Sequence, residues 1–127
     1  MKKITVLNKA KLIARFAAEK KGEDIVLMDM RKISMICDWF VLISAGSSRR
    51  INAISRIIQE RLSKKSLYPL HVEGKNDPYW ALLDYEDVVV HVFYKEIRDF
   101  YGLERLWSDA PLEHFDNKCL VKMSRKE

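Results

Sequence analysis

His91 is the residue of this chain best suited to chemistry, because an imidazole titrates near neutral pH and can act as a general base. It stands in an apolar run at residues 88–93, which is typical of a strand. Asp84, on the preceding segment, could hold the ring in one tautomer. The alternative is a histidine with a purely structural role. His71 and His114 have no supporting context, so no Ser-His-Asp or Cys-His arrangement is predicted.

Residues 46–48, Gly-Ser-Ser, follow a strand-like run and precede a helical one. The free amides at such a helix start attract phosphate, although a turn glycine and a serine cap explain the pattern equally. Nucleotidyltransferases open this way and carry two acidic residues, one apart, on the next strand. Here the next strand, residues 68–72, has no such pair, and Asp84, Glu86 and Asp87 lie at a later turn. We therefore expect no metal, no cofactor and no enzymatic activity.

The remaining functional classes are limited by composition. Cys37 and Cys119 form no CxxC pair and have no histidine at ligand spacing, so neither a disulfide framework nor a zinc site is predicted. No apolar run reaches the roughly 18 residues of a membrane span, and the first residues lack the apolar region of a signal peptide. We expect a cytoplasmic protein with reduced cysteines.

The chain of 127 residues is the length of one domain, and its apolar share of 48% is enough for a core. Periodicity predicts a helix capped by Asn8 and ended by Gly22, and a short link at 86–87 predicts a hairpin. We expect a single α/β domain at 1–110, with a mixed sheet of about five strands covered by helices, and a polar tail at 111–127. The predicted strands are residues 24–30, 38–44, 68–72, 79–85 and 88–93, and the further helices are 51–62 and 95–101.

The net charge of +5 is unevenly distributed. Residues 1–21 carry +6, residues 22–115 carry −3 and residues 116–127 carry +2. Basic ends attract a polyanion such as RNA, although they also simply keep a small protein in solution.

Aromatic residues are concentrated between positions 79 and 107, where acidic residues outnumber Lys95, Arg98 and Arg105. Strand alternation sends Trp80, Leu82 and Asp84 to one face of the sheet, opposite Leu83. An aromatic face with a polar rim is typical of a protein interface, and stacking on RNA bases is the other use of such a face. Because an acidic surface repels phosphate, we favour a basic protein as the partner.

Several strings in the chain are distinctive, namely Asp38–Ser48 (DWFVLISAGSS), Val72–Gly74, Trp80–Asp84, Asp87–Phe93 and Arg98–Trp107 (RDFYGLERLW). Together they resemble the ribosomal silencing factor family, also called Iojap. The resemblance covers residues 8–110 and implies a nucleotidyltransferase-like fold without catalytic carboxylates. It also implies binding to ribosomal protein fourteen of the large subunit, which blocks joining of the small subunit and represses translation in starvation.

The resemblance implies partner-binding positions within these strings. In this sequence they are Trp80, Leu82, Asp84, His91, Arg98, Tyr101, Glu104 and Trp107. Trp80 and Leu82 would be anchors, and Asp84 and Glu104 would pair with cations of the partner. Arg98 and His91 would brace the acidic groups. A second contact of the basic N-terminal helix with ribosomal RNA and a homodimer are left open, as are an RNA-binding ribosome assembly factor and a metal-dependent nucleotidyltransferase.

Overall fold

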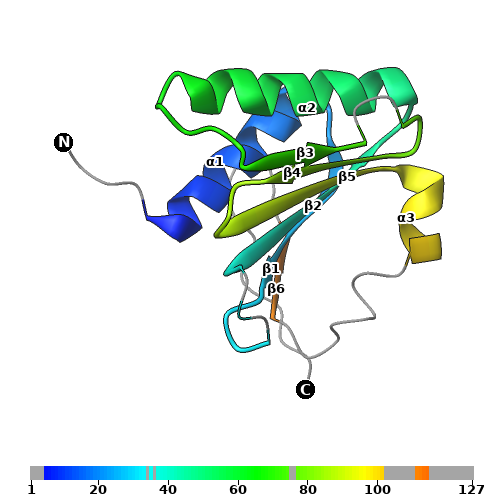
Figure 1. Cartoon of the computed structure of the whole chain (residues 1–127). Coiled ribbons are helices and arrows are strands. Elements are labelled where there is room, and N and C mark those ends of the chain that lie inside the picture. Colours follow the sequence, from blue (N-terminus) through cyan, green and yellow to red (C-terminus); the bar gives the residue numbers. More distant parts are fainter. Residues whose placement is uncertain (1–4, 34, 36, 75–76, 102–110, 115–127) are drawn as a thin grey trace.

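The computed structural model describes residues 5–33, 35, 37–74, 77–101 and 111–114. These residues form helices and strands in the order α-β-β-α-β-β-β-α-β (Figure 1). The helices are α1 (Val6–Glu19), α2 (Ser48–Ser63) and α3 (Lys95–Tyr101). The strands are β1 (Glu23–Asp29), β2 (Trp39–Ala45), β3 (His71–Glu73), β4 (Trp80–Asp84), β5 (Val88–Tyr94) and β6 (Leu112–His114).

The strands make one mixed sheet in the order β3-β4-β5-β2-β1-β6. The pair β2–β5 is parallel, whereas all other neighbours are antiparallel. The hairpin between β4 and β5 is confirmed: the Tyr85 N–H donates to the Val88 carbonyl at 2.8 Å, and Glu86 takes a positive φ of 76° in the turn. The predicted α/β fold with a mixed sheet is therefore confirmed.

The sheet extends beyond the five strands expected from the sequence. Leu112–His114 form β6, which pairs with β1, and the Asp29 N–H donates to the carbonyl of Pro111 at 2.9 Å. These residues fall in the segment for which we predicted a polar tail, and here the strand pairing corrects that prediction. Three residues are too few to show an alternating pattern, so the exposed edge of β1, rather than local sequence, selects them.

The start of α1 differs from the predicted one. Thr5, not Asn8, is the cap: its side-chain oxygen accepts the Asn8 N–H at 3.1 Å, so the helix begins at Val6. The helix ends at Glu19, and Lys21 adopts a positive φ of 63° just before Gly22. A Cβ at Gly22 would lie 2.9 Å from the Ile43 side chain, so this glycine lets the chain turn closely against β2.

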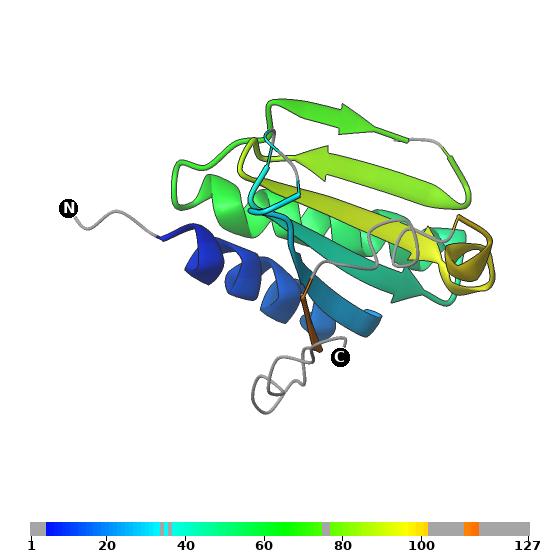
Figure 2. The same ribbon diagram turned by 90° about the horizontal axis from the view of Figure 1, so that it is seen from below.

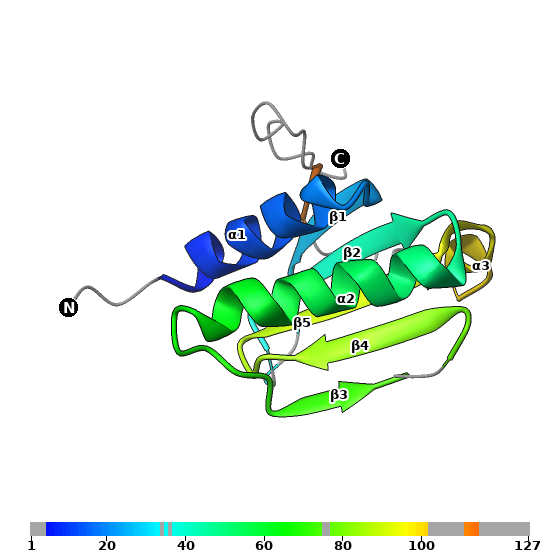
Figure 3. The same cartoon turned by 90° about the horizontal axis from the view of Figure 1, so that it is seen from above.

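Both long helices cover the same face of the sheet, as Figures 1 and 3 show. Their buried stripes include Ile13 and Ala17 from α1 and Ile54 and Ile58 from α2. These side chains pack against inward-facing residues of the central strands, such as Val41, Ile43, Leu83, Val90 and Val92, to form the main core. The sheet is thus anchored on one side by the two long helices.

Candidate functional site

Strand β4 separates the two faces of the sheet as predicted. Ala81 and Leu83 are buried in the main core, whereas Trp80, Leu82 and Asp84 are half-buried on the opposite side. We call this opposite side, turned away from α1 and α2, the distal face (Figure 2). Its residues on the three neighbouring strands are Trp80, Leu82, Asp84, Val89, His91, Phe93, Phe40, Leu42 and Ser44.

The register brings the distal-face residues into rows across the strands. Leu82 stands opposite His91, and His91 stands opposite Leu42. Trp80 stands opposite Phe93 in the next row. A smaller apolar cluster from β1 and β2, which includes Met28 and Leu42, continues this surface, with Phe40 and Leu82 packed against it. The distal face is therefore broadly apolar.

His91 lies at the centre of the distal face between two aromatic rings. Its ring centroid is 4.8 Å from that of Phe40 and 5.8 Å from that of Phe93, with which it stacks. The residue is 8% exposed, and neither ring nitrogen has a hydrogen-bond partner among the residues that the structure describes. Burial lowers its pKa to about 4, so the imidazole is neutral at pH 7.

The expected hydrogen bond between Asp84 and His91 is wrong. Asp84 stands opposite Val89 rather than His91, and its carboxylate accepts the Glu86 N–H at 2.8 Å within the turn. Asp84 is therefore engaged in shaping the hairpin. Within the described chain, neither a carboxylate nor a nucleophile is hydrogen-bonded to the imidazole.

Arg98 is buried and holds the edge of the distal face together. Its guanidinium, on α3, donates to Ser44 Oγ of β2 at 2.8 Å and to the backbone carbonyl of Asp24 in β1. It thus fixes where α3 sits against the end of β2. Because Arg98 and His91 are both buried, their geometry suits bracing the surface rather than direct contact with a partner.

The three remaining predicted positions are Tyr101, Glu104 and Trp107. Tyr101 is the last residue of α3, and Glu104 and Trp107 lie outside the described residues. Sequence reasoning did not single out Phe40 and Leu42 for this surface. The alternation of residues 38–44 is the signal that could have found them, because it places both on the side of Ser44.

The turn at Gly46 and Ser47 serves α2. The Ser47 hydroxyl accepts the Arg50 N–H at 3.1 Å, which is the bond of a helix cap. Of the three turn carboxylates, Asp87 pairs with Lys9 and Asp84 with a backbone amide. Among residues 5–33, 35, 37–74, 77–101 and 111–114, no cluster of three or more His, Cys, Asp or Glu side chains could hold a metal ion.

Two further expectations concern cysteines and membranes. Cys37 is buried, and Cys119 lies outside the described residues. None of the described helices is long and apolar enough to cross a membrane.

The fold is a single α/β domain in which most of the distal face is buried and Phe40, Trp80, Leu82 and Asp84 are its half-buried residues. A model of the family "Ribosomal silencing factor during starvation" matches residues 3–127. The chain therefore belongs to the ribosomal silencing factor family, and the resemblance drawn from its sequence strings is confirmed.

Individual relatives agree with this assignment. The chain is 39% identical over 106 residues to ribosomal silencing factor RsfS of Bacillus subtilis, covering 84% of this chain and 90% of that protein. It is 32% identical over 102 residues to the chloroplastic protein Iojap of Zea mays, covering 80% of this chain and 44% of that one.

Solved structures are similar as well. The crystal structure of protein CV0518 from Chromobacterium violaceum has a TM-score of 0.80 and 28% identity, covering 83% of this chain and 88% of that one. A crystal structure from Bacillus halodurans has a TM-score of 0.73 and 32% identity, covering 80% of this chain and 94% of that one.

Proposed function

We propose that this protein represses translation in the cytoplasm by binding the large ribosomal subunit through the distal face and blocking the joining of the small subunit. Membership of the ribosomal silencing factor family supports a role on the ribosome. The observation that carries the proposal is a sheet face on which Trp80 and Leu82 stay half-buried, since aromatic and aliphatic anchors of this kind dominate protein interfaces.

The partner we propose is ribosomal protein fourteen, a basic protein. Outside the two long helices and their caps, the described residues hold twelve Asp and Glu but only four Lys and Arg, so this part of the molecule is acidic. Asp84 and Glu73 stand on the same side of the sheet as Trp80 and Leu82. A negative rim around an apolar centre favours a basic protein partner and disfavours phosphate.

A second contact, between ribosomal RNA and the basic N-terminal helix, is part of this proposal. In α1 and its caps, Lys11, Arg15, Lys20 and Lys21 form no ion pair with any other described residue. They are on the side of the molecule opposite the distal face, so both contacts can exist at once.

Sedimentation with separated ribosomal subunits tests the proposal. The protein should be recovered with large subunits and not with small ones, and equal recovery with both would contradict it. Adding the protein before the subunits meet should lower the yield of joined ribosomes more than adding it afterwards, because the protein and the small subunit compete for one surface of the large subunit. Equal inhibition in both orders, or saturable binding of a nucleotide that requires Mg²⁺, would favour an enzymatic function instead.

A further inference from the structure

The two long helices carry most of the positive charge of the described chain. Residues 5–21 and 47–65 hold eleven Lys and Arg residues against two carboxylates, Glu19 and Glu60. The remaining described residues are net acidic. The charge is thus unevenly distributed between a basic helix layer (α1, α2 and their caps) and a net acidic remainder of the described chain.

Most of these cations are not used within the fold. Lys9 is paired with Asp87, Arg61 is paired with Glu19 at 2.7 Å, and Arg50 donates to a backbone carbonyl at the end of α1. The eight other cations of the layer have no ion pair among the residues the structure describes. They are Lys11, Arg15, Lys20, Lys21, Arg49, Arg56, Lys64 and Lys65. Their mutual repulsion is relieved most directly by a polyanion.

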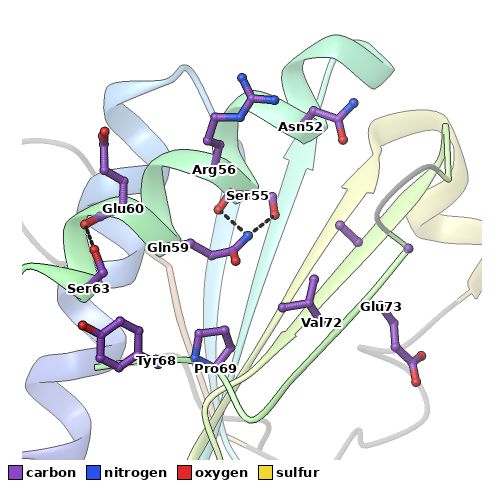
Figure 4. Close-up of a pocket in the computed structure, with 12 residues that line it drawn as sticks. Asn52, Ser55, Arg56, Gln59, Glu60, Ser63, Tyr68, Pro69, Val72 and Glu73 are labelled. Carbon is purple, nitrogen blue, oxygen red and sulfur yellow. Dashed lines mark hydrogen bonds between the residues drawn. The ribbon is translucent and has the colours of Figure 1, made fainter. Parts of the chain in front are cut away.

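A groove of about 680 Å³ borders this layer, between α2 and the strands β3 and β4 (Figure 4). The volume lies within the roughly 300–1,000 Å³ range of small-ligand sites. In Figure 4, Tyr68 and Pro69 lie at the end near Ser63, whereas the Glu73 side chain points away from α2, as its register opposite Leu82 requires. Glu73 is engaged by His71, whose Nε2 lies 2.7 Å from the carboxylate.

The groove offers the groups that recognise a nucleobase. Tyr68 is 66% exposed, which is unusual for a large aromatic side chain and leaves its ring free to stack. Gln59 donates its amide hydrogens to the backbone carbonyl and hydroxyl of Ser55, at 3.3 and 3.2 Å. Its amide oxygen has no partner among the described residues and can accept a hydrogen bond from a base. Lys64 and Lys65 precede Tyr68 by a few residues at the end of α2.

We propose that the groove beside α2 binds an unpaired nucleotide of single-stranded RNA, with the base stacked on Tyr68 and the neighbouring phosphates held by Arg56, Lys64 and Lys65. This inference rests on the ribosomal RNA contact proposed above for α1. It adds that the base is recognised in the groove beside α2. Stacking and backbone cations together are the usual means of binding a single strand. An acidic polypeptide would pair with the cations but would not place a base against the exposed ring of Tyr68.

The test measures binding of a fluorescein-labelled, unstructured RNA oligonucleotide by anisotropy over a range of salt concentrations. Tyr68→Ala should weaken binding at least fivefold, whereas Tyr68→Phe should retain it, since stacking needs the ring and not the hydroxyl. Leu70→Ala is the matched control, because Leu70 is 68% exposed in the same segment and has no ring. Loss of binding with Leu70→Ala equal to that with Tyr68→Ala would overturn the assignment of the groove, as would unchanged binding with Tyr68→Ala.

The role of the cations is tested with two double variants of equal charge. Arg56→Gln with Lys65→Gln should lower the slope of log affinity against log salt by about 1.4, at roughly 0.7 for each phosphate that is no longer neutralised. Lys32→Gln with Lys95→Gln removes the same charge outside the layer and should leave the slope unchanged. Equal effects of the two pairs, or equal binding of polyglutamate, would overturn the proposal. Trp80→Ala, on the distal face, should bind the naked RNA oligonucleotide normally, so failure of the groove is distinguishable from failure of the distal-face function.

Discussion

The ammonium group of Lys9, in the first turn of α1, lies 2.6 Å from the carboxylate Oδ1 of Asp87, in the turn between β4 and β5. The Lys9 side chain is 10% exposed, and that of Asp87 is 34% exposed. The backbone carbonyl of Asp87 also accepts the N–H groups of Asp38 and Trp39, at 2.8 and 3.1 Å. One turn residue therefore joins the first helix, the start of β2 and the β4–β5 hairpin.

Asp87→Ala should destabilise the protein by about 1–3 kcal/mol, because it leaves a buried ammonium without a counter-ion. Lys9→Met in the same background should recover part of the loss, since it removes the orphaned charge and keeps the volume. Urea denaturation of the single and the double variant measures the two changes in the free energy of unfolding. Purely additive losses in the double variant would show that the pair contributes nothing.

Arg98→Leu should cost about 1–3 kcal/mol, because it leaves Ser44 Oγ and the Asp24 carbonyl without their donor. Lys95→Ala, on the same short helix, is the control. Its ammonium is half exposed and lies 3.8 Å from Glu23, so its loss should stay within about 0.5 kcal/mol. Thermal melts of the two variants decide whether Arg98 is the residue that holds α3.

Trp80→Ala should weaken large-subunit binding by at least about 2 kcal/mol, the scale of an aromatic hot spot, while the domain still unfolds cooperatively. Tyr79→Ala is the matched control, because Tyr79 is an exposed aromatic residue directly beside it. Sedimentation at several protein concentrations gives the affinities. Normal binding by folded Trp80→Ala would rule out the distal face as the docking surface.

Leu83→Ala should behave in the opposite way and cost about 2–5 kcal/mol of stability, because this side chain is fully buried beneath α2. Its affinity for the large subunit, measured where the variant is folded, should stay unchanged. An unchanged melting temperature would mean that β4 does not present its two faces as described.

The pH dependence of stability should reflect His91. Its pKa is about 4 in the folded protein and 6.5 in the unfolded chain, so folding favours the neutral ring. This contribution is complete above pH 6.5 and is lost as the pH falls toward 4, by up to about 3 kcal/mol. His91→Phe should flatten the fall in stability between pH 7 and 5 relative to the parent, as followed by urea denaturation. An identical pH profile would show that the ring is solvated in the folded state.

The parts of the structure that the sequence predicts are those governed by local periodicity. The alternation of residues 79–84 correctly separates Leu83 from Trp80, and the serine at position 47 correctly marks a helix cap. The parts it misses depend on distant partners. The register between β4 and β5 places Asp84 opposite Val89 rather than His91, and this register cannot be predicted from either strand alone. Strand β6 forms because it pairs with the edge of β1. Likewise, α1 is predicted as basic, but only the fold places α2 beside it.

The parallel pairing of β2 with β5 has a consequence for the order in which the chain can fold. Trp39 and Val88 are partners at one end of this pair, yet α2, β3 and β4 lie between them in the chain. The closure entropy of that long loop must be overcome before the central ladder forms, which slows folding. During synthesis, the edge of β2 stays unpaired on the side later taken by β5 until Val88–Tyr94 have been made. A truncated chain that ends before Val88 would therefore expose Val41 and Ile43 along that edge and tend to self-associate.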